Sequence, residues 1–220
     1  MSVKKIISYE VPTILPDDTG DTAMRLMEEN NIEEIPVVYN DQYLALIKQD
    51  DMMEWDTPEK PVTASDFLRY SPAVFSEGHA YEALSLAYNQ RLSVIPIIDE
   101  QNKYLGAATR ETLLNYLAEN SGLDNTGGVI VLEIKPTEYS LYEIARICES
   151  EEISIITTQL FTNRATGKLE LTIKTNRSNL ESLATTYERF GYTVKELYGE
   201  RSNKDDMMDR YNLLMAYINM

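Results

Sequence analysis

The segment Ile32-Glu33-Glu34-Ile35-Pro36-Val37-Val38 returns sixty residues later as Leu92-Ser93-Val94-Ile95-Pro96-Ile97-Ile98. Each copy places a proline in a β-branched run, which is typical of a strand that is not in the middle of a sheet. Three more pairs of segments repeat at an offset of 60 or 61: 12–17 with 72–77, 23–26 with 83–86, and 43–45 with 104–106. Residues 1–120 are therefore a duplicated unit, with repeats of about 1–60 and 61–120.

The spacing of apolar residues predicts the order β-α-β-β-α in each repeat. In the first repeat we expect a short extended segment at 14–15, a helix capped by Asp21 or Thr22, and a hairpin that turns at Asn40-Asp41. A second helix should begin near Gln49. Such a unit is too small to bury a core alone, so the two repeats must pack together.

The second half of the chain predicts a separate domain. Residues 121–128 are rich in turn formers and form a linker. Residues 129–198 predict β-α-β-β-α-β, the ferredoxin-like order, with Ser140 as a helix cap and Cys148 on the buried face of that helix. Residues 199–220 predict an amphipathic terminal helix with a heptad-like apolar seam. The predicted fold class is α+β.

The charge of the chain argues against several partners. The net charge is −16, and residues 1–120 carry 21 acidic against 9 basic side chains. Nucleic acids and anionic membranes attract clustered lysine and arginine, so we expect neither as a partner. No apolar run reaches the roughly 20 residues of a membrane helix, and the first residues do not form a signal segment, so we expect a cytoplasmic protein.

The sequence offers no catalytic or metal site that we can identify. His79, the one histidine, precedes a predicted helix, and no third group orients it toward Cys148. Adjacent acidic pairs point in different directions on a helix or strand and do not clasp a metal ion together. Gly-rich phosphate loops and zinc-ligand spacings are missing from the sequence. We therefore expect a protein that is not an enzyme.

The proline-containing hairpin followed by Gly106-Ala107-Ala108-Thr109 resembles the CBS domain, which occurs as tandem pairs called Bateman modules. The resemblance implies ligand clefts between the repeats, with an adenine nucleotide (AMP, ADP or ATP) or a related metabolite as regulatory ligand and no required cofactor. The domain at 129–198, placed behind such a pair, resembles the ACT domain. The whole arrangement is similar to acetoin-utilisation-type CBS–ACT proteins.

In nucleotide-binding members of this family, a hydroxyl at the end of the Gly-containing strand meets phosphate, and an aspartate three residues later holds the ribose hydroxyls. The first repeat has Ala45, Lys48 and Asp51 at these positions, and the second has Gly106, Thr109 and Thr112. The resemblance thus gives a candidate ligand-binding set: Lys48, Asp51, Thr109, Arg110 and Thr112. Since each repeat keeps only half of the pattern, we expect one asymmetric site.

A structural interpretation of the same residues stays open. Thr109 and Thr112 would cap the closing helix, Lys48 and Asp51 would be solvated, and Arg110 would pair with a neighbouring carboxylate.

Two functions follow from these alternatives. The first is a regulatory ligand sensor that couples a bound metabolite to the geometry of a homodimer, formed through the CBS pair, the ACT-like domain or the terminal helix. The second is an interaction scaffold with vestigial clefts. In either case the regulated protein is unknown. For the ACT-like domain we favour a structural or dimerising role over amino-acid sensing, because 136–138 and 151–152 carry side chains where that ligand loop has glycine.

Overall fold

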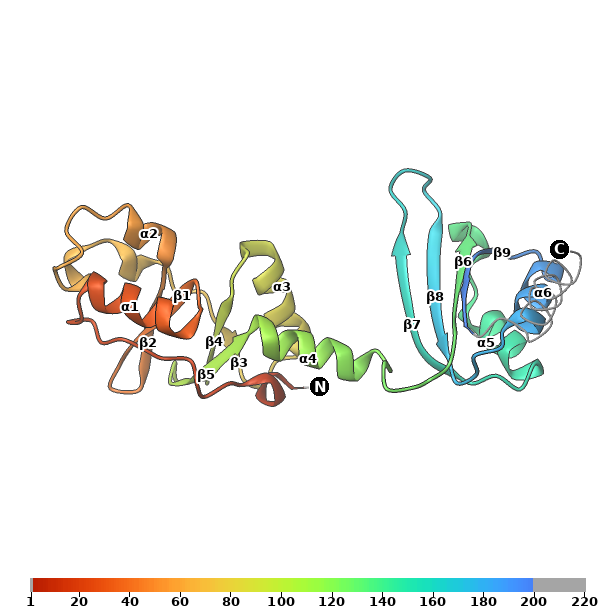
Figure 1. The fold of residues 1–220 in the computed structure, drawn as a ribbon, viewed down its shortest axis with the longest axis horizontal. Helices are drawn as coiled ribbons and strands as arrows, with labels where there is room; N and C mark the ends of the chain where they lie inside the picture. The colour runs from red at the N-terminus through yellow and green to blue at the C-terminus, as the bar shows by residue number, and fades with distance from the viewer. Residues whose placement is uncertain (1, 200–220) are drawn as a thin grey trace, which may run out of the picture. The chain divides into compact units, whose positions relative to one another are not determined.

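The computed structural model describes residues 2–199, and the chain divides into two compact units, Met1–Leu117 and Ala118–Met220. Each unit has its own sheets and core (Figure 1). The terminal helix predicted for 199–220 lies, apart from Gly199, outside the described residues.

The first unit contains both repeats. The first repeat holds a helix, a hairpin and a short helix: α1 (Gly20–Asn30), β1 (Glu34–Tyr39), β2 (Gln42–Lys48) and α2 (Gln49–Met53). The second holds β3 (Val74–Phe75), α3 (Ala80–Gln90), β4 (Val94–Ile98), β5 (Tyr104–Thr109) and α4 (Arg110–Asn120). Short 3-10 helices lie at η1 (Val3–Ile6), η2 (Val62–Ala64) and η3 (Phe67–Arg69). The predicted order of elements is confirmed, with a single bridge from Ile14 to Val37 as the first strand of repeat one.

Local backbone signals explain most of these boundaries. Asn40 and Asp41 both have positive φ, as a two-residue hairpin turn requires, which confirms the predicted turn. The predicted cap of α1 is wrong: Thr19 precedes the helix and its Oγ1 accepts from the Thr22 amide at 3.3 Å. Asp21 and Thr22 already belong to the first turn of the helix, where a side chain no longer caps.

The two repeats exchange backbone hydrogen bonds. The N-terminal segment of repeat one pairs with β5 of repeat two, since Ser8 and Ala107 exchange N–H···O bonds of 2.8 and 3.1 Å. The N-terminal segment of repeat two pairs with β2 of repeat one in turn, since the Leu46 amide donates to the Tyr70 carbonyl at 2.8 Å. Each repeat therefore satisfies backbone groups that the other would leave unpaired, and the repeats form one folded unit.

Side chains of β2 reach two different cores. Ala45 and Ile47 face the cluster formed by the helices of repeat one, whereas Leu46 and Tyr43 belong to the cluster dominated by repeat two. Leu46 alternates with its neighbours Ala45 and Ile47, whereas Tyr43 reaches the face of Leu46 because the pairing of β1 with β2 shifts register at Leu44. The hairpin of repeat one is thus buried on both faces, and its run of apolar residues reflects that.

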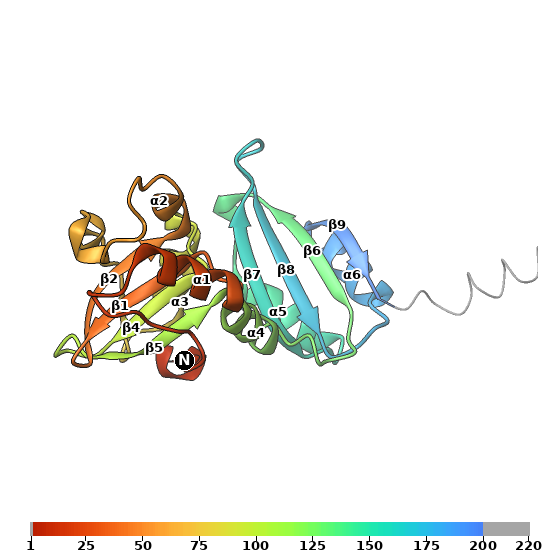
Figure 2. The same ribbon diagram turned by 60° about the vertical axis from the view of Figure 1, so that its left-hand side comes forward.

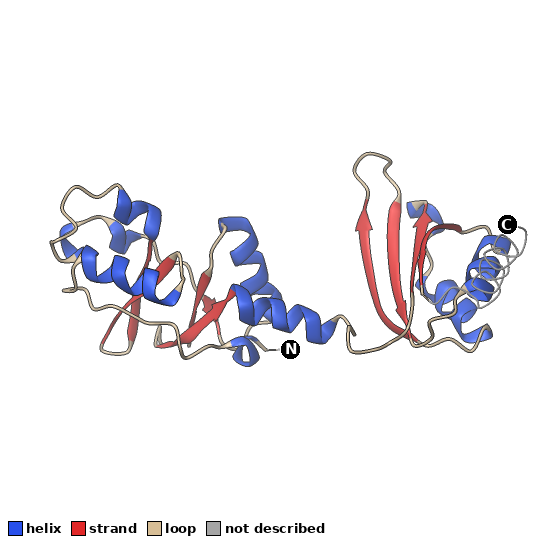
Figure 3. Ribbon diagram, viewed as in Figure 1, coloured by secondary structure: helices blue, strands red, loops and turns tan. Residues whose placement is uncertain are grey.

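The second unit is an antiparallel sheet covered by helices. In chain order it contains β6 (Val129–Ile134), α5 (Leu141–Ser150), β7 (Ile155–Thr162), β8 (Leu169–Thr175), α6 (Glu181–Arg189) and β9 (Thr193–Tyr198), with a 3-10 turn η4 (Pro136–Glu138) after β6. The strands lie in the order β7-β8-β6-β9, and α5 and α6 cover one face (Figures 2 and 3). The predicted strand at 153–158 begins later and runs longer, because the Ile153 amide still bonds to Cys148 O at 2.9 Å behind α5.

The lone cysteine lies in the core of this unit, as predicted. Cys148 is 1% exposed, and its Sγ lies 2.9 Å from the hydroxyl oxygen of the fully buried Tyr187. Burial raises the pKa of the Cys148 thiol, although the hydrogen bond with Tyr187 opposes the change. The thiol is therefore a packing group with a hydrogen-bond partner.

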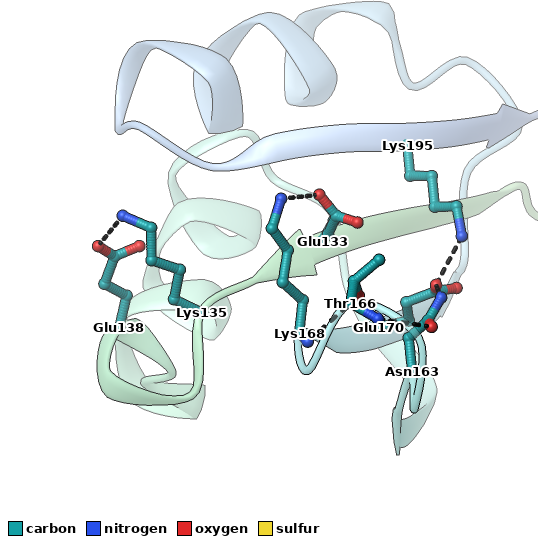
Figure 4. Close-up of polar contacts among 8 residues, drawn as sticks. All are labelled: Glu133, Lys135, Glu138, Asn163, Thr166, Lys168, Glu170 and Lys195. Atoms are coloured by element: carbon teal, nitrogen blue, oxygen red, sulfur yellow. Dashed lines mark hydrogen bonds and ion pairs between the residues drawn. The ribbon is translucent and has the colours of Figure 1, made fainter.

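The sheet face opposite the helices carries a charged array (Figure 4). Glu133 and Glu170 stand directly opposite each other in neighbouring strands, a repulsive arrangement for two carboxylates. Lys168 contacts Glu133, and Lys195 Nζ lies 2.6 Å from Glu170 Oε1. A hydrogen bond from Asn163 and the charge of Lys195 lower the pKa of the Glu170 carboxyl. The two lysines offset the repulsion between the Glu133 and Glu170 carboxylates and so favour this strand register.

At Gly106, the N-terminal segment that contains Ile7 and Ser8 passes close to β5. The φ of Gly106 is +137°, and a Cβ there would lie 2.6 Å from Ile7 Cγ2 and 2.9 Å from Ser8 O. We predict that Gly106→Ala lowers the free energy of unfolding by about 1–3 kcal/mol, measured by urea denaturation. Ala45→Gly changes the equivalent residue in the opposite direction, and we expect it to destabilise through added chain entropy by about 0.5–1 kcal/mol. A Gly106→Ala protein as stable as the wild type would contradict the close approach of Ser8.

Candidate functional site

Two cavities lie between the repeats of the first unit. The first cleft, of about 480 Å³, is lined by Ser8, Glu10, Val11, Pro12, Asn30, Asn31, Ile32, Ser93, Thr109, Arg110, Glu111, Thr112 and Asn115. The second cleft, of about 510 Å³, is lined by Glu33, Glu34, Lys48, Gln49, Asp50, Gln90, Arg91 and Arg110. Each cleft takes residues from both repeats, and each volume is in the range of small-molecule sites.

The duplication relates one cleft to the other. Thr109 occupies the first cleft at the repeat position that Lys48 occupies in the second. Likewise, Asn31 at the end of α1 lines the first cleft, and Arg91 at the end of α3 lines the second. The geometry of the two clefts is thus shared, while their side chains have diverged.

The structure divides the predicted site residues between these clefts. Thr109, Arg110 and Thr112 line the first, Lys48 and Arg110 line the second, and the exposed Asp51 lines neither. The predicted residues thus line two clefts rather than one, for a geometric reason. Lys48 and Thr109 hold the same position in two repeats, so the internal symmetry places them at opposite clefts.

The two threonines cap α4. The Thr112 amide donates to Thr109 Oγ1 at 3.2 Å, and the Thr109 amide donates to Thr112 Oγ1 at 2.9 Å. The Thr112 hydroxyl also donates to the Thr109 carbonyl at 3.1 Å. This reciprocal pattern satisfies orphan groups of the helix start, which confirms the capping interpretation of these residues.

Arg110 is held by a carboxylate of the other repeat. Its Nη1 and Nη2 donate to Glu33 Oε1 and Oε2 at 2.9 and 2.6 Å, a bidentate pair. The hydrogen bond to Arg110 lowers the pKa of the Glu33 carboxyl, and the same bond raises the pKa of Arg110. The pairing predicted for this arginine is confirmed, and its guanidinium lies on the wall shared by both clefts.

A buried carboxylate joins the repeats at the same place. Glu34 is 4% exposed, and its Oε2 accepts from the Ser93 amide at 2.8 Å, the Ser93 hydroxyl at 2.5 Å and the Val94 amide at 3.1 Å. Ser93 Oγ in turn accepts from the Glu33 amide at 3.0 Å. We did not predict this junction, although a glutamate within an otherwise apolar strand was a signal for it.

Lys48 lies over an aromatic ring in the second cleft. Its Nζ is 4.7 Å from the centroid of Tyr70, a cation–π contact. The Tyr70 hydroxyl donates to the side-chain oxygen of Gln90, which also lines this cleft. The aromatic ring positions the lysine without neutralising its charge.

Comparison with known proteins identifies the duplicated unit. The CBS domain model matches residues 3–57 and 64–119, half of the chain. The chain belongs to the CBS domain family.

Two curated relatives match part of the chain. The inosine-5'-monophosphate dehydrogenase of Methanocaldococcus jannaschii is 32% identical over 138 residues, which cover 59% of this chain and 27% of the dehydrogenase. A CBS domain-containing protein of Dictyostelium discoideum is 26% identical over 130 residues, 52% of this chain and 90% of its own. The chain thus spans about a quarter of the first of these relatives.

Two solved structures that are similar to this chain are a CBS domain pair/ACT domain protein and a putative acetoin utilization protein. A CBS domain pair/ACT domain protein from Thermotoga maritima has a TM-score of 0.48 and 21% identity, over 54% of this chain and 98% of that one. A putative acetoin utilization protein from Vibrio cholerae has a TM-score of 0.48 and 18% identity, over 56% and 95% of the two chains.

None of the helices within residues 2–199 is long and apolar enough to span a membrane. That part of the chain also contains no group of three or more His, Cys, Asp or Glu side chains placed to hold a metal ion.

The Glu34 junction can be tested by removing its hydroxyl donor. We predict that Ser93→Ala lowers the free energy of unfolding of the first unit by about 1–3 kcal/mol, because a buried carboxylate loses a donor and the Glu33 amide loses its acceptor. Chemical denaturation measures this change. Ser85→Ala, on the exposed face of α3, is the matched control and should stay within about 0.5 kcal/mol of the wild type. Equal stability of the two variants would show that the junction contributes little.

Proposed function

We propose that this chain is a non-catalytic regulatory protein of the cytoplasm that binds a small metabolite between its two CBS repeats. The observation that carries the proposal is the pair of cavities of about 480 and 510 Å³, each lined by both repeats. A ligand in such a cleft contacts both halves of the unit, so its affinity depends on how the halves are arranged. Binding can therefore shift the population of two arrangements.

An adenine nucleotide is the ligand class that we propose. The clefts offer amide and hydroxyl groups for a base and a ribose, and cationic groups for phosphate, in Thr109, Thr112, Arg110 and Lys48. Asp51 is not among the residues that line either cleft. No cofactor is required.

We further propose that the second unit is a ferredoxin-like, ACT-like domain with a dimerising role. The order β-α-β-β-α-β and the strand order β7-β8-β6-β9 support this proposal. The proposed domain limits are 1–120 for the CBS pair, 121–128 for the linker, 129–198 for this domain and 199–220 for the terminal helix. A homodimer would give the ligand-dependent change a second copy to act on, and a regulated protein as yet unknown would respond to it.

One observation favours the alternative, an interaction scaffold with vestigial clefts. At the first cleft, the Thr109 and Thr112 side chains cap α4 and Arg110 is paired with Glu33. These donors already have partners inside the protein, so a ligand must compete with them or share them.

A thermal-shift series with AMP, ADP, ATP and adenosine tests nucleotide binding. We expect at least one of them to raise the melting temperature of the full chain, because a ligand at 100 times its Kd adds about 2.7 kcal/mol to the stability of the native state. Asn115→Trp narrows the first cleft and Gln49→Trp narrows the second, so the affected cleft should lose the shift. Ser85→Trp, outside both clefts, serves as the control. If none of the four compounds shifts the wild type at millimolar concentration, the scaffold is the better account.

A further inference from the structure

One edge of the sheet in the second unit is an uncharged strand. β7 forms this edge, beside β8, and β9 forms the other edge (Figure 3). The eight residues of β7 include no charged side chain and no proline, and the last five are exposed. Its pairing with β8 shifts register only between Ile155 and Thr157, so residues 157–162 are regular. Within residues 2–199 no further strand pairs with the outer side of β7, which is therefore a template for another strand.

The opposite edge of the sheet carries features that disfavour such pairing. Strand β9 contains Lys195 and Glu196, and its pairing with β6 shifts register between Val131 and Leu132. Charged side chains and bulges on an edge strand oppose the addition of a further strand. The two edges of this sheet therefore differ, and β7 is the edge that is open to a partner strand.

Large apolar side chains of β7 are exposed on both faces of the sheet. Leu160 stands opposite Leu171 of β8, on the face that the helices cover, and Phe161 stands opposite Glu170 on the other face. The exposed fractions of Leu160 and Phe161 are 44% and 53%. A strand added beside β7 would place its own side chains next to both of them, as neighbouring strands do within a sheet.

An acidic groove lies at the start of β7. Its volume is about 430 Å³, and its lining comes from α5, the turn after α5 and the first residue of β7: Ala145, Cys148, Glu149, Glu152, Ile153, Ser154 and Ile155. The charged residues of this lining are Glu149 and Glu152. Glu152 contacts Arg177 at 3.5 Å, whereas Glu149 is exposed and has no ion pair within residues 2–199.

The other end of β7 leads into a basic turn. This turn, residues 163–168, contains Arg164 and Lys168. Lys168 contacts Glu133, whereas Arg164 is exposed and forms no ion pair in the part of the chain that the structure describes. At about 3.3 Å per residue, the two ends of the strand lie roughly 25 Å apart. The edge is thus acidic at one end, basic at the other and uncharged between them.

We propose that β7 pairs antiparallel with β7 of a second copy of this chain, so that Arg164 of each copy lies at the acidic groove of the other. A two-fold axis relates the same surface on both copies, and antiparallel pairing across it brings the start of each β7 to the end of the other. Unlike charges then meet at both ends, whereas parallel pairing would bring two acidic grooves together. This inference rests on the dimerising role proposed for the second unit, and it names the surface and the orientation.

Gln159→Lys tests the pairing of the two strands. Gln159 is exposed near the middle of β7, so two lysines would lie close together at the axis of the dimer. Because like charges repel there, we expect the dimer Kd of the full chain to weaken by at least about 10-fold in sedimentation equilibrium. The circular dichroism spectrum should stay that of the wild type. Thr193→Lys adds the same charge to the exposed start of β9 and should leave the dimer Kd unchanged.

Reversal of charge tests the orientation of the two copies. Arg164→Glu should weaken the dimer at low ionic strength, because it brings like charges together at both ends of the interface. Glu149→Arg should weaken it for the same reason, while the monomer stays folded because a cation is favourable in the last turn of α5. A chain with both substitutions has opposite charges again and should recover most of the wild-type affinity.

Hydrogen exchange at several protein concentrations locates the interface. We expect the amides of residues 157–162 to become better protected as the concentration rises through the dimer Kd, and those of 193–198 to exchange at a constant rate. Equal exchange of 157–162 at all concentrations would overturn the inference. So would a chain that is monomeric throughout, or a dimer Kd that Gln159→Lys and the charge reversals leave unchanged.

The outcomes separate this inference from the proposed ligand sensing. A nucleotide-dependent rise in melting temperature, together with a dimer that survives Gln159→Lys, contradicts the β7 interface and supports ligand sensing. A dimer that Gln159→Lys dissociates, in a chain that no nucleotide stabilises, supports the β7 interface and contradicts ligand sensing.

Discussion

Backbone hydrogen bonds between each repeat and the N-terminal segment of the other repeat hold the first unit together. Ser8 pairs with Ala107, and Tyr70 accepts from Leu46. Neither repeat can leave the other without exposing these groups, and the Leu46 side chain would leave its core as well. The clefts exist because of this constraint, since it fixes two helix ends and two strand ends of different repeats beside each other.

The Glu34 junction adds a polar contact to the same boundary. A carboxylate buried between repeats is costly unless donors surround it, and Ser93 and Val94 provide three. Such a contact is directional, so it favours one arrangement of the repeats over others in which apolar surfaces could also meet. It lies at the wall of the second cleft.

Much of the fold could be predicted from the sequence, because its signals are local. The repeat of Ile35-Pro36-Val37 as Ile95-Pro96-Ile97 predicts the strands β1 and β4, and Asn40-Asp41 predicts the turn that follows β1. The assembly of the site could not be predicted in the same way. The family pattern shows which positions of a repeat face a cleft, but it does not show how the two repeats face each other. Lys48 and Thr109 were therefore predicted to share one site, whereas they line different clefts.

Two further features required the three-dimensional backbone. Arg91 is an ordinary arginine in the sequence, and only its positive φ marks it as unusual. The partners of Glu34 are Ser93 and Val94, the repeat equivalents of Glu33 and Glu34, and the repeat alone does not show that these two segments lie side by side. The candidate residues Thr109, Arg110 and Thr112 do line a cleft. Their hydrogen bonds within the protein depend on the geometry of the α4 start and on the position of Glu33. The spacing of residues suggested these bonds but could not establish them.

The two repeats fold as one body around their clefts. Native-state hydrogen exchange tests this most directly, because amides that open only in global unfolding share one free energy of opening. We expect the same value for the amides of Leu46 and Ala107, which bond across repeats, as for those of Val38 and Ser76, which bond within a repeat. Exchange of Leu46 and Ala107 through a lower-energy opening, while Val38 and Ser76 stay protected, would show repeats that separate independently and would contradict the claim.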